Sequence, residues 1–242
     1  MRTAWIVAAR DLRAMVRGWL AWVLIAGALL VEGLYFYAFG LGAEGAKLSG
    51  DVLLRFFDGA SATAIAVALV LGMRSFAAER ERGTLVLLTT APVPTRDLVL
   101  GKLLAGLVVL AALQAGSLHM PALVLVHGRV APAHVAIGYL GVMLLGGACL
   151  AIGIFASTLA RSQAVAAVVA AVIVGALLLA WMVARTAEPP WSDGLAAIAL
   201  HHAHQRPFMR GVLRLEHVVY YVGVVVTSQL AAARALHARR WT

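Results

Sequence analysis

Four polar side chains that lie inside long apolar segments have the clearest potential for chemistry. They are Glu32, Gln114, Ser117 and His119. Polar groups in a membrane segment are costly and often functional, so these four could line a path for a polar molecule or relay a proton. Glu32 lies toward the outer end of its segment, where Arg55 could satisfy its charge instead. A structural role and a role in a pathway both stay open, and an intramembrane enzyme or channel built on Glu32 and His119 is a rival hypothesis.

Three neighbouring histidines, His201, His202 and His204, raise the question of a metal site. His201 and His204 have the i, i+3 spacing that can chelate a metal from one helix. No acidic or thiolate ligand stands beside them, so we expect no metal. We favour a short interfacial helix over the apolar stretch 195–200, whose histidines and arginines meet headgroups or a neighbouring loop. Cys149 is the single cysteine and lies in an apolar run, which excludes a disulfide framework.

The composition places these residues in a membrane protein. Of 242 residues, 62% are hydrophobic and 13% are charged, and the mean hydropathy is +0.91, whereas a soluble domain carries about a quarter charged residues. The net charge of +9 could indicate nucleic acid binding, but the basic residues flank apolar segments, so we expect no nucleic acid partner. No Ser/His/Asp set or carboxylate pair stands out, which argues against an enzyme.

Six apolar segments are long enough to cross a bilayer and predict an all-α membrane protein. The segments are 19–41, 60–78, 98–126, 134–159, 163–184 and 218–236. An even number of spans places both termini on one side, and 13 of the 20 Lys and Arg residues fall on that side. We therefore expect both termini in the cytoplasm and treat residues 1–242 as one membrane domain. The first segment exceeds the core of a signal peptide, so we expect it to stay uncleaved.

Residues 2–18, before the first span, have the pattern of an amphipathic helix. At about 100° per residue, four arginines cluster on one side of the wheel, opposite an apolar face. The arginines are Arg2, Arg10, Arg13 and Arg17, and the apolar face holds Trp5, Ala8, Leu12, Met15, Val16 and Trp19. Such a helix lies in the headgroup plane with its guanidinium groups toward anionic lipid. Arg10, Arg13 and Arg17 are therefore candidate lipid-interface residues.

Small residues and one proline predict how the spans pack. Close backbone approach drives helix association in lipid, and small-residue steps occur around Gly147 in the fourth span and Gly175 in the fifth. We favour packing within one chain over a dimer interface for these steps. Pro121 cannot donate a backbone hydrogen bond to the carbonyl of Ser117, so the third span should bend there.

A dense charged passage, Glu79–Arg82, separates the second and third spans. After it, Gly83 offers a break, residues Thr84–Thr90 can form a short helix, and Pro92 and Pro94 enforce an extended turn. An ordinary solvated loop would need neither the apolar residues nor the two prolines. The pattern predicts a small rigid helix that is presented to a soluble partner at the membrane surface.

This passage resembles a known family. Glu-x-Glu-x-Gly-Thr-Leu from Glu79, a proline turn, and Thr-Arg-Asp-x-x-x-Gly-Lys from Thr95 are similar to the first cytoplasmic loop of ABC-2 type transporter permeases. The resemblance extends over nearly the whole chain. The ending from Phe208 through Tyr220-Tyr221 to Arg239-Arg240-Trp241 is most similar to the branch associated with gliding motility and nitrous-oxide-reductase maturation. The chain departs from some members in having no large extracytoplasmic domain.

The resemblance implies a permease subunit of the bacterial inner membrane, an exporter in our interpretation, that is not itself an enzyme. Two copies, identical or paralogous, would assemble with two ATP-binding subunits, which bind ATP and Mg²⁺. Gly101-Lys102 lacks the other residues of a nucleotide-binding loop. A coupling helix would enter a cleft of the ATPase, and the ATPase-coupling residues would be Glu79, Glu81, Gly83, Thr84, Leu85, Leu87 and Leu88. The alternative is a mechanotransmitter that relays ATPase motion to a periplasmic partner through the outer loop.

Overall fold

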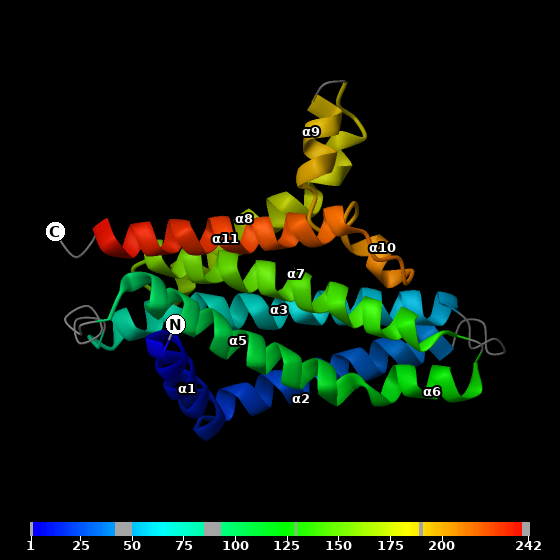
Figure 1. The fold of residues 1–242 in the computed structure, drawn as a ribbon, viewed down its shortest axis with the longest axis horizontal. Coiled ribbons are helices and arrows are strands. Elements are labelled where there is room, and N and C mark those ends of the chain that lie inside the picture. The colour runs from blue at the N-terminus through cyan, green and yellow to red at the C-terminus, as the bar shows by residue number, and fades with distance from the viewer. Residues whose placement is uncertain (1, 42–49, 85–92, 129, 189–190, 239–242) are drawn as a thin grey trace.

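A computed structural model shows one bundle of α-helices (Figure 1). It describes residues 2–41, 50–84, 93–128, 130–188 and 191–238, and this part of the chain contains no β-strand. The helices are α1 (Arg2–Arg17), α2 (Trp19–Tyr35), η1 (Phe36–Leu41), α3 (Gly50–Glu81), α5 (Thr95–Ser117), α6 (His119–His127), α7 (Pro132–Leu159), α8 (Gln163–Ala184), α9 (Trp191–Ile198), α10 (Gln205–Met209) and α11 (Leu215–Ala238). The all-α fold class is confirmed.

Six helical segments within the described residues are long and apolar enough to cross a membrane, as predicted. They are Trp19–Phe39, Gly50–Glu81, Thr95–His127, Pro132–Leu159, Gln163–Ala184 and Leu215–Ala238. The second begins about ten residues before its predicted start. The apolar window ends where charges appear, but Phe56 and Phe57 continue the buried face of α3 and pack edge-on against Tyr139 of α7. Tertiary packing therefore extends the helix beyond the apolar run.

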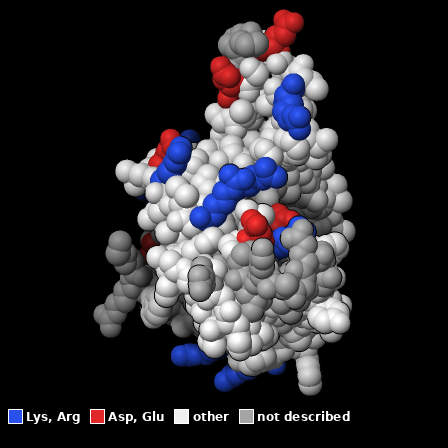
Figure 2. Space-filling view, turned by 90° about the vertical axis from the view of Figure 1, so that its right-hand side faces the viewer, with Lys and Arg blue, Asp and Glu red and all other residues white. Residues whose placement is uncertain are grey.

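The first and last described residues lie at the same end of the bundle (Figure 1), as an even number of spans requires. We call this the terminal end and the other the opposite end. The C-terminal part of α8 and α9 project together from the side of the bundle as an arm (Figure 1). Figure 2 views the opposite end, where charged side chains form a few patches and mark the tip of the arm, while most of the surface is uncharged.

α3 and α7 form the centre of the bundle and cross where two glycines meet. A Cβ atom on Gly72 would lie 2.7 Å from the Cα of Gly153, so no side chain fits between the two backbones. Close approach of this kind is the usual basis of helix association in lipid. The small-residue step at Gly147 likewise faces neighbouring residues, with Leu107 of α5 at 3.2 Å from its ideal Cβ. The packing predicted for the fourth span is therefore found.

The fifth span packs through a different face from the one its sequence pattern suggested. Ala166, Ala170 and Val174 are buried, whereas Ala171 is exposed and an added Cβ on Gly175 would meet no atom within 4 Å. One residue turns a helix by about 100°, so these two sets lie on different faces. The expectation that the Gly175 step packs within the chain is wrong.

The third span breaks where the proline was expected to act. α5 ends at Ser117, α6 begins at His119, and Leu118 joins them with only a long 3.4 Å bond from its N–H to the carbonyl of Ala115. Pro121 lies in the first turn of α6, where its missing N–H matters least. The Ser117 carbonyl is the one that Pro121 leaves without its helical donor.

α1 is a helix, as predicted, and docks on α5. Ala4 and Val7 are buried, and an added Cβ on Gly101 would lie 2.7 Å from the Cβ of Val7, so only glycine lets the two helices approach this closely. Trp5 and Val16, which the wheel placed on the apolar face, are largely exposed. The position of α1 in the headgroup layer stays a prediction.

Candidate functional site

The terminal end carries an ion-pair network, defined here as Arg10, Asp11, Glu79 and Lys102, that joins three helices. Lys102 of α5 is only 5% exposed, and its Nζ lies 3.0 Å from Asp11 Oδ2 of α1 and 2.8 Å from Glu79 Oε1 of α3. Arg10 adds contacts of 2.8 Å to Asp11 and 3.5 Å to Glu79. A buried ammonium is tolerated only when it is paired, so the network holds α1, α3 and α5 in one arrangement.

Two charges in the sequence indicate this network, although their pairing was not predicted. Lys102 is a lone charge at the edge of an apolar span, and Asp11 is the single acid in an arginine-rich helix. Each needs an opposite charge, and Gly101 brings α1 close enough for the two to meet. Thr3 of α1 strengthens the same junction by donating its hydroxyl proton to Asp97 near the start of α5.

α3 ends beside this network in a Schellman motif. Gly83 has φ +70°, its N–H donates to the carbonyl of Arg80 at 3.0 Å, and the Thr84 N–H donates to the carbonyl of Glu79 at 2.9 Å. Positive φ is costly for residues with a Cβ, so the glycine fixes the end of the helix. The break predicted at Gly83 is thus found.

A second set of contacts ties this end of α3 to the turn between α7 and α8. The backbone N–H of Gln163 donates to Glu81 Oε1 at 2.8 Å, and the Gln163 side chain donates to the other carboxylate oxygen. Gln163 is the first residue of α8, so the carboxylate lies at the positive end of that helix dipole. Arg80 donates to the carbonyl of Ala160 in the same turn.

The predicted ATPase-coupling residues therefore divide into two groups. Glu79 and Glu81 contact this chain's own residues, and Gly83 and Thr84 form the turn that ends α3. The expected coupling helix, with Leu85, Leu87 and Leu88, lies outside the described residues apart from Thr84. The helices before and after the 85–92 segment in the chain, α3 and α5, are both held in place by these contacts.

A second polar group lies inside the bundle around Glu32 of α2, which is 3% exposed. Thr63 of α3 donates its hydroxyl proton to Glu32 Oε1, and the nearest further polar groups include Ser117. The Ser117 hydroxyl lies 3.0 Å from that of Tyr139 of α7. In the described part of the chain Glu32 Oε2 has no hydrogen-bond partner. Thr63, rather than the expected Arg55, is the partner of this carboxyl.

Among the described residues, the other two pathway candidates form no hydrogen bond with this group, although His119 is near enough for its charge to act on Glu32. His119 is exposed, and its Nδ1 lies 2.9 Å from the carbonyl of Gly116. The Gln114 amide donates to the sulfur of Met143 at 3.3 Å. The fold thus brings Glu32 and Ser117 together and leaves His119 at the surface of the helix.

The three histidines near the opposite end take three different partners. His201 Nε2 lies 3.8 Å from Asp58, His202 stacks on Trp181, and His204 Nδ1 lies 2.9 Å from His217 Nδ1. Burial lowers the pKa of His201 and of His202 below the ordinary value, and for His201 the nearby Asp58 acts in the opposite direction. Over the residues described, no three potential metal ligands come together.

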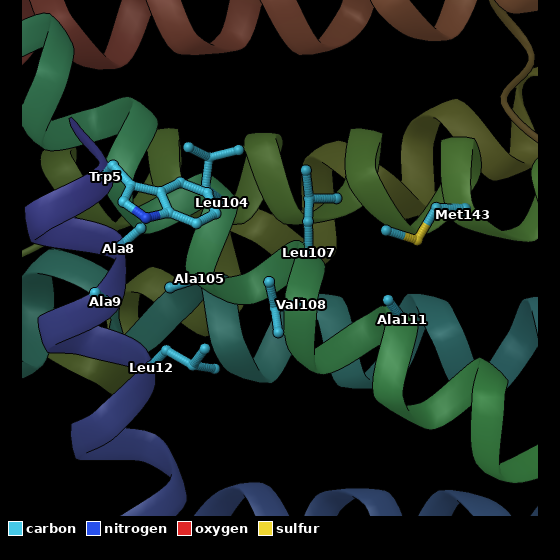
Figure 3. A pocket seen from close by; sticks show the side chains of 10 residues that line it. All are labelled: Trp5, Ala8, Ala9, Leu12, Leu104, Ala105, Leu107, Val108, Ala111 and Met143. Carbon is cyan, nitrogen blue, oxygen red and sulfur yellow. The ribbon is translucent and has the colours of Figure 1, made fainter. Parts of the chain in front are cut away.

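Two cavities flank α1 at the terminal end. One, of about 260 Å³, is apolar and lies between α1, α5 and α7, with Trp5 and Leu104 at one end and Met143 at the other (Figure 3). The second, of about 360 Å³, opens on the other side of α1 and has both charged and apolar walls. The lipid-interface candidates Arg10, Arg13 and Arg17 are all exposed on this helix.

Comparison with models of known families gives a match over most of the chain. The family described as ABC-2 family transporter protein matches residues 5–205 of the chain. The matched range runs from α1 to the first residue of α10 and so includes the ion-pair network and the Glu32 group. None of the curated proteins matches the chain.

Proposed function

We propose that force from ATP hydrolysis in a partner subunit enters this chain at the terminal end and drives substrate across the membrane, because the chain belongs to the family of ABC-2 transporter proteins. Family membership makes the chain a multi-pass membrane permease component of an ABC transporter, with ATP hydrolysis in a separate ATP-binding subunit. The coupling route, the direction of transport and the assembly are the proposal. We take the direction to be export.

The observation that carries the coupling proposal is the clamped end of α3. Lys102 ties it to α1 and α5, and Glu81 ties it to the start of α8. A push on the 85–92 segment is then shared by four helices rather than absorbed by one. Such a rigid group of helices is the element that nucleotide state can bias between two arrangements.

We place the terminal end in the cytoplasm and the chain in the bacterial inner membrane. The excess of Lys and Arg on that side supports this orientation, since cytoplasmic loops carry more basic residues. The C-terminal sequence beyond Phe208 supports the gliding-motility and nitrous-oxide-reductase-maturation branch. Residues 1–242 then act as one permease domain without a cofactor of its own.

A second copy of the permease, identical or paralogous, would pack against the face of α8 that carries Ala171 and Gly175. This face is open in the single chain, and small residues there allow close backbone approach between helices. Two copies would bring two coupling segments to two ATP-binding subunits.

The test of the coupling role is Leu87→Asp, with Val212→Asp as a matched control. Val212 is an exposed apolar residue outside the spans, between α10 and α11. The full chain is coexpressed with its ATP-binding partner subunit, the complex is purified, and ATP hydrolysis by the complex is measured in nanodiscs. We expect the Leu87 variant to lose co-purification and stimulation of hydrolysis, and the Val212 variant to keep both. Unchanged co-purification and stimulation in the Leu87 variant would contradict the coupling role.

The mechanotransmitter remains the second candidate, and the projecting arm favours it. α9 projects from the bundle (Figure 1) and begins with the exposed Trp191, to which a periplasmic partner could bind. In that case Trp191→Ala should abolish capture of the partner while the membrane complex and its ATP hydrolysis persist. A variant that still captures the partner removes the arm from this role.

A further inference from the structure

The cavity of about 360 Å³ beside α1, whose walls are both charged and apolar, has the polarity of a phospholipid. One face of α3, with Arg82 just after its end, forms the long wall; the residues in the row are Leu71, Arg74, Ser75, Ala78, Glu79 and Arg82. From Leu71 to Arg82 the helix rises about 16 Å. Leu71 marks the end of the wall deeper in the bundle, and the charged residues Arg74, Glu79 and Arg82 follow toward the terminal end, so a molecule in the cavity meets both apolar atoms and ions.

α1 and α2 complete the apolar part of the cavity. Met15 and Ala14 come from α1, Leu20 comes from the start of α2, and Gly18 between the two helices leaves the wall open there. The cavity therefore lies where the proposed interfacial helix turns into the first span. This is the depth at which the glycerol region of a lipid is found.

The charges around the cavity are of both signs and alternate along the wall. Arg74 and Arg82 line it as cations, while Asp11 and Glu79 line it as carboxylates, with Lys102 between the two acids. Glu79 Oε2 has no hydrogen-bond partner among the described residues. The cavity thus offers guanidinium donors for a phosphate and carboxylate acceptors for an ammonium group.

We propose that this cavity is a binding site for phosphatidylethanolamine of the adjoining leaflet. The phosphate is bound by Arg74 and Arg82, since guanidinium groups form strong charge-assisted hydrogen bonds with phosphate. The primary ammonium donates to Glu79 and Asp11, and the first carbons of an acyl chain lie against Leu71. The site does not depend on the coupling proposal, because it requires only that the chain spans the membrane.

The two carboxylates distinguish this lipid from the other common headgroups. The trimethylammonium of phosphatidylcholine has no N–H to donate to Glu79. Phosphatidylglycerol satisfies the arginines but brings no ammonium group to Glu79 Oε2, which has no hydrogen-bond partner among the described residues. Selectivity for a primary amine therefore comes from Glu79 and Asp11, and affinity for phosphate from the arginines.

The experiment measures lipid retained by the purified full chain in native mass spectrometry. Detergent micelles are supplied with equal amounts of dioleoyl phosphatidylethanolamine, phosphatidylglycerol and phosphatidylcholine. We expect the ethanolamine lipid to be retained about tenfold more than the choline lipid, as one charge-assisted hydrogen bond predicts. Equal retention of the three lipids, or preference for the glycerol lipid, would overturn the proposal.

Variants then assign the contacts. Arg82→Gln changes an exposed residue just after the end of α3 and should lower retention of the ethanolamine lipid about tenfold, whereas Arg55→Gln, an exposed residue near the other end of α3 and outside the cavity, should not. Glu79→Gln should remove the preference over choline. Because Glu79 also pairs with Lys102, Ala78→Leu provides a second variant that fills the cavity without altering a charge. If Arg82→Gln and Ala78→Leu both bind lipid as the parent does, the site is wrong.

Discussion

Replacing Lys102 with methionine tests how much of the fold depends on the ion-pair network. Methionine keeps most of the apolar stem and removes the charge, which faces Asp11 and Glu79 and lies 5.0 Å from the centre of the Phe76 ring. Removing one partner of a buried pair costs about 3–5 kcal/mol. The two carboxylates are partly exposed and Arg10 remains beside them, so we expect the lower end, about 3 kcal/mol of unfolding free energy.

The measurement is an SDS titration of the purified full chain in mixed micelles, followed by the change in helical circular dichroism. Arg10→Met is the matched control, because Arg10 is 51% exposed and an exposed ion pair contributes about 1 kcal/mol or less. A triple variant, Lys102→Met with Asp11→Asn and Glu79→Gln, should recover most of the loss, since it leaves no buried charge unpaired. The reasoning fails if Lys102→Met costs no more than the control, or if the triple variant is no more stable than Lys102→Met.

Three further outcomes follow from the same structure. Gly72→Val should prevent stable folding, because its Cβ would meet the α7 backbone, whereas Gly27→Ala, with open space around it, should unfold within about 1 kcal/mol of the parent in the same titration. Burial holds the pKa of His201 in the folded state below its value in the unfolded state, so the imidazole takes up a proton more readily in the unfolded state. Stability therefore falls as the pH drops below about 6.5. Protection factors of the amides at residues 197–210, which compare the intrinsic hydrogen-exchange rate at each pH with the observed rate, should be lower at pH 5.5 than at pH 7.5, and His201→Gln should reduce that difference; equal protection in the parent at the two pH values contradicts it. Glu32→Gln should keep the unfolding free energy within about 1 kcal/mol, because an amide still accepts from Thr63 without a buried charge; a larger loss indicates that the charge itself is needed.

The spans could be predicted from sequence because each is an apolar run longer than the bilayer requires. The bend at Leu118 was predictable for a similar reason, since Pro121 acts on its own helix. Local rules also fixed the end of α3, where Gly83 supplies the one backbone conformation that a Schellman motif needs. These features depend on neighbours within a few residues.

Features that depend on distant residues were missed or misplaced. Lys102 and Asp11 are 91 positions apart, and nothing local shows that Gly101 brings them together. The face of α8 was misjudged because Ala170 and Ala171 are equally small, and only the positions of α3 and α7 decide which of them is buried. The 85–92 segment lies outside the described residues, so the coupling helix stays a prediction.

The crossing at Gly72 and Gly153 divides α3 into two segments of unequal length, and the two helices meet there through backbone atoms. The segment from Gly72 to Gly50 is about 33 Å long and the segment from Gly72 to Glu81 is about 14 Å long, at 1.5 Å per residue. Rotation about the glycines would therefore enlarge a 2 Å displacement near Glu81 to about 5 Å near Gly50. A small displacement of α3 at one surface of the membrane therefore becomes a larger displacement at the other surface. Distances between spin labels placed at the two ends of α3 would measure both displacements.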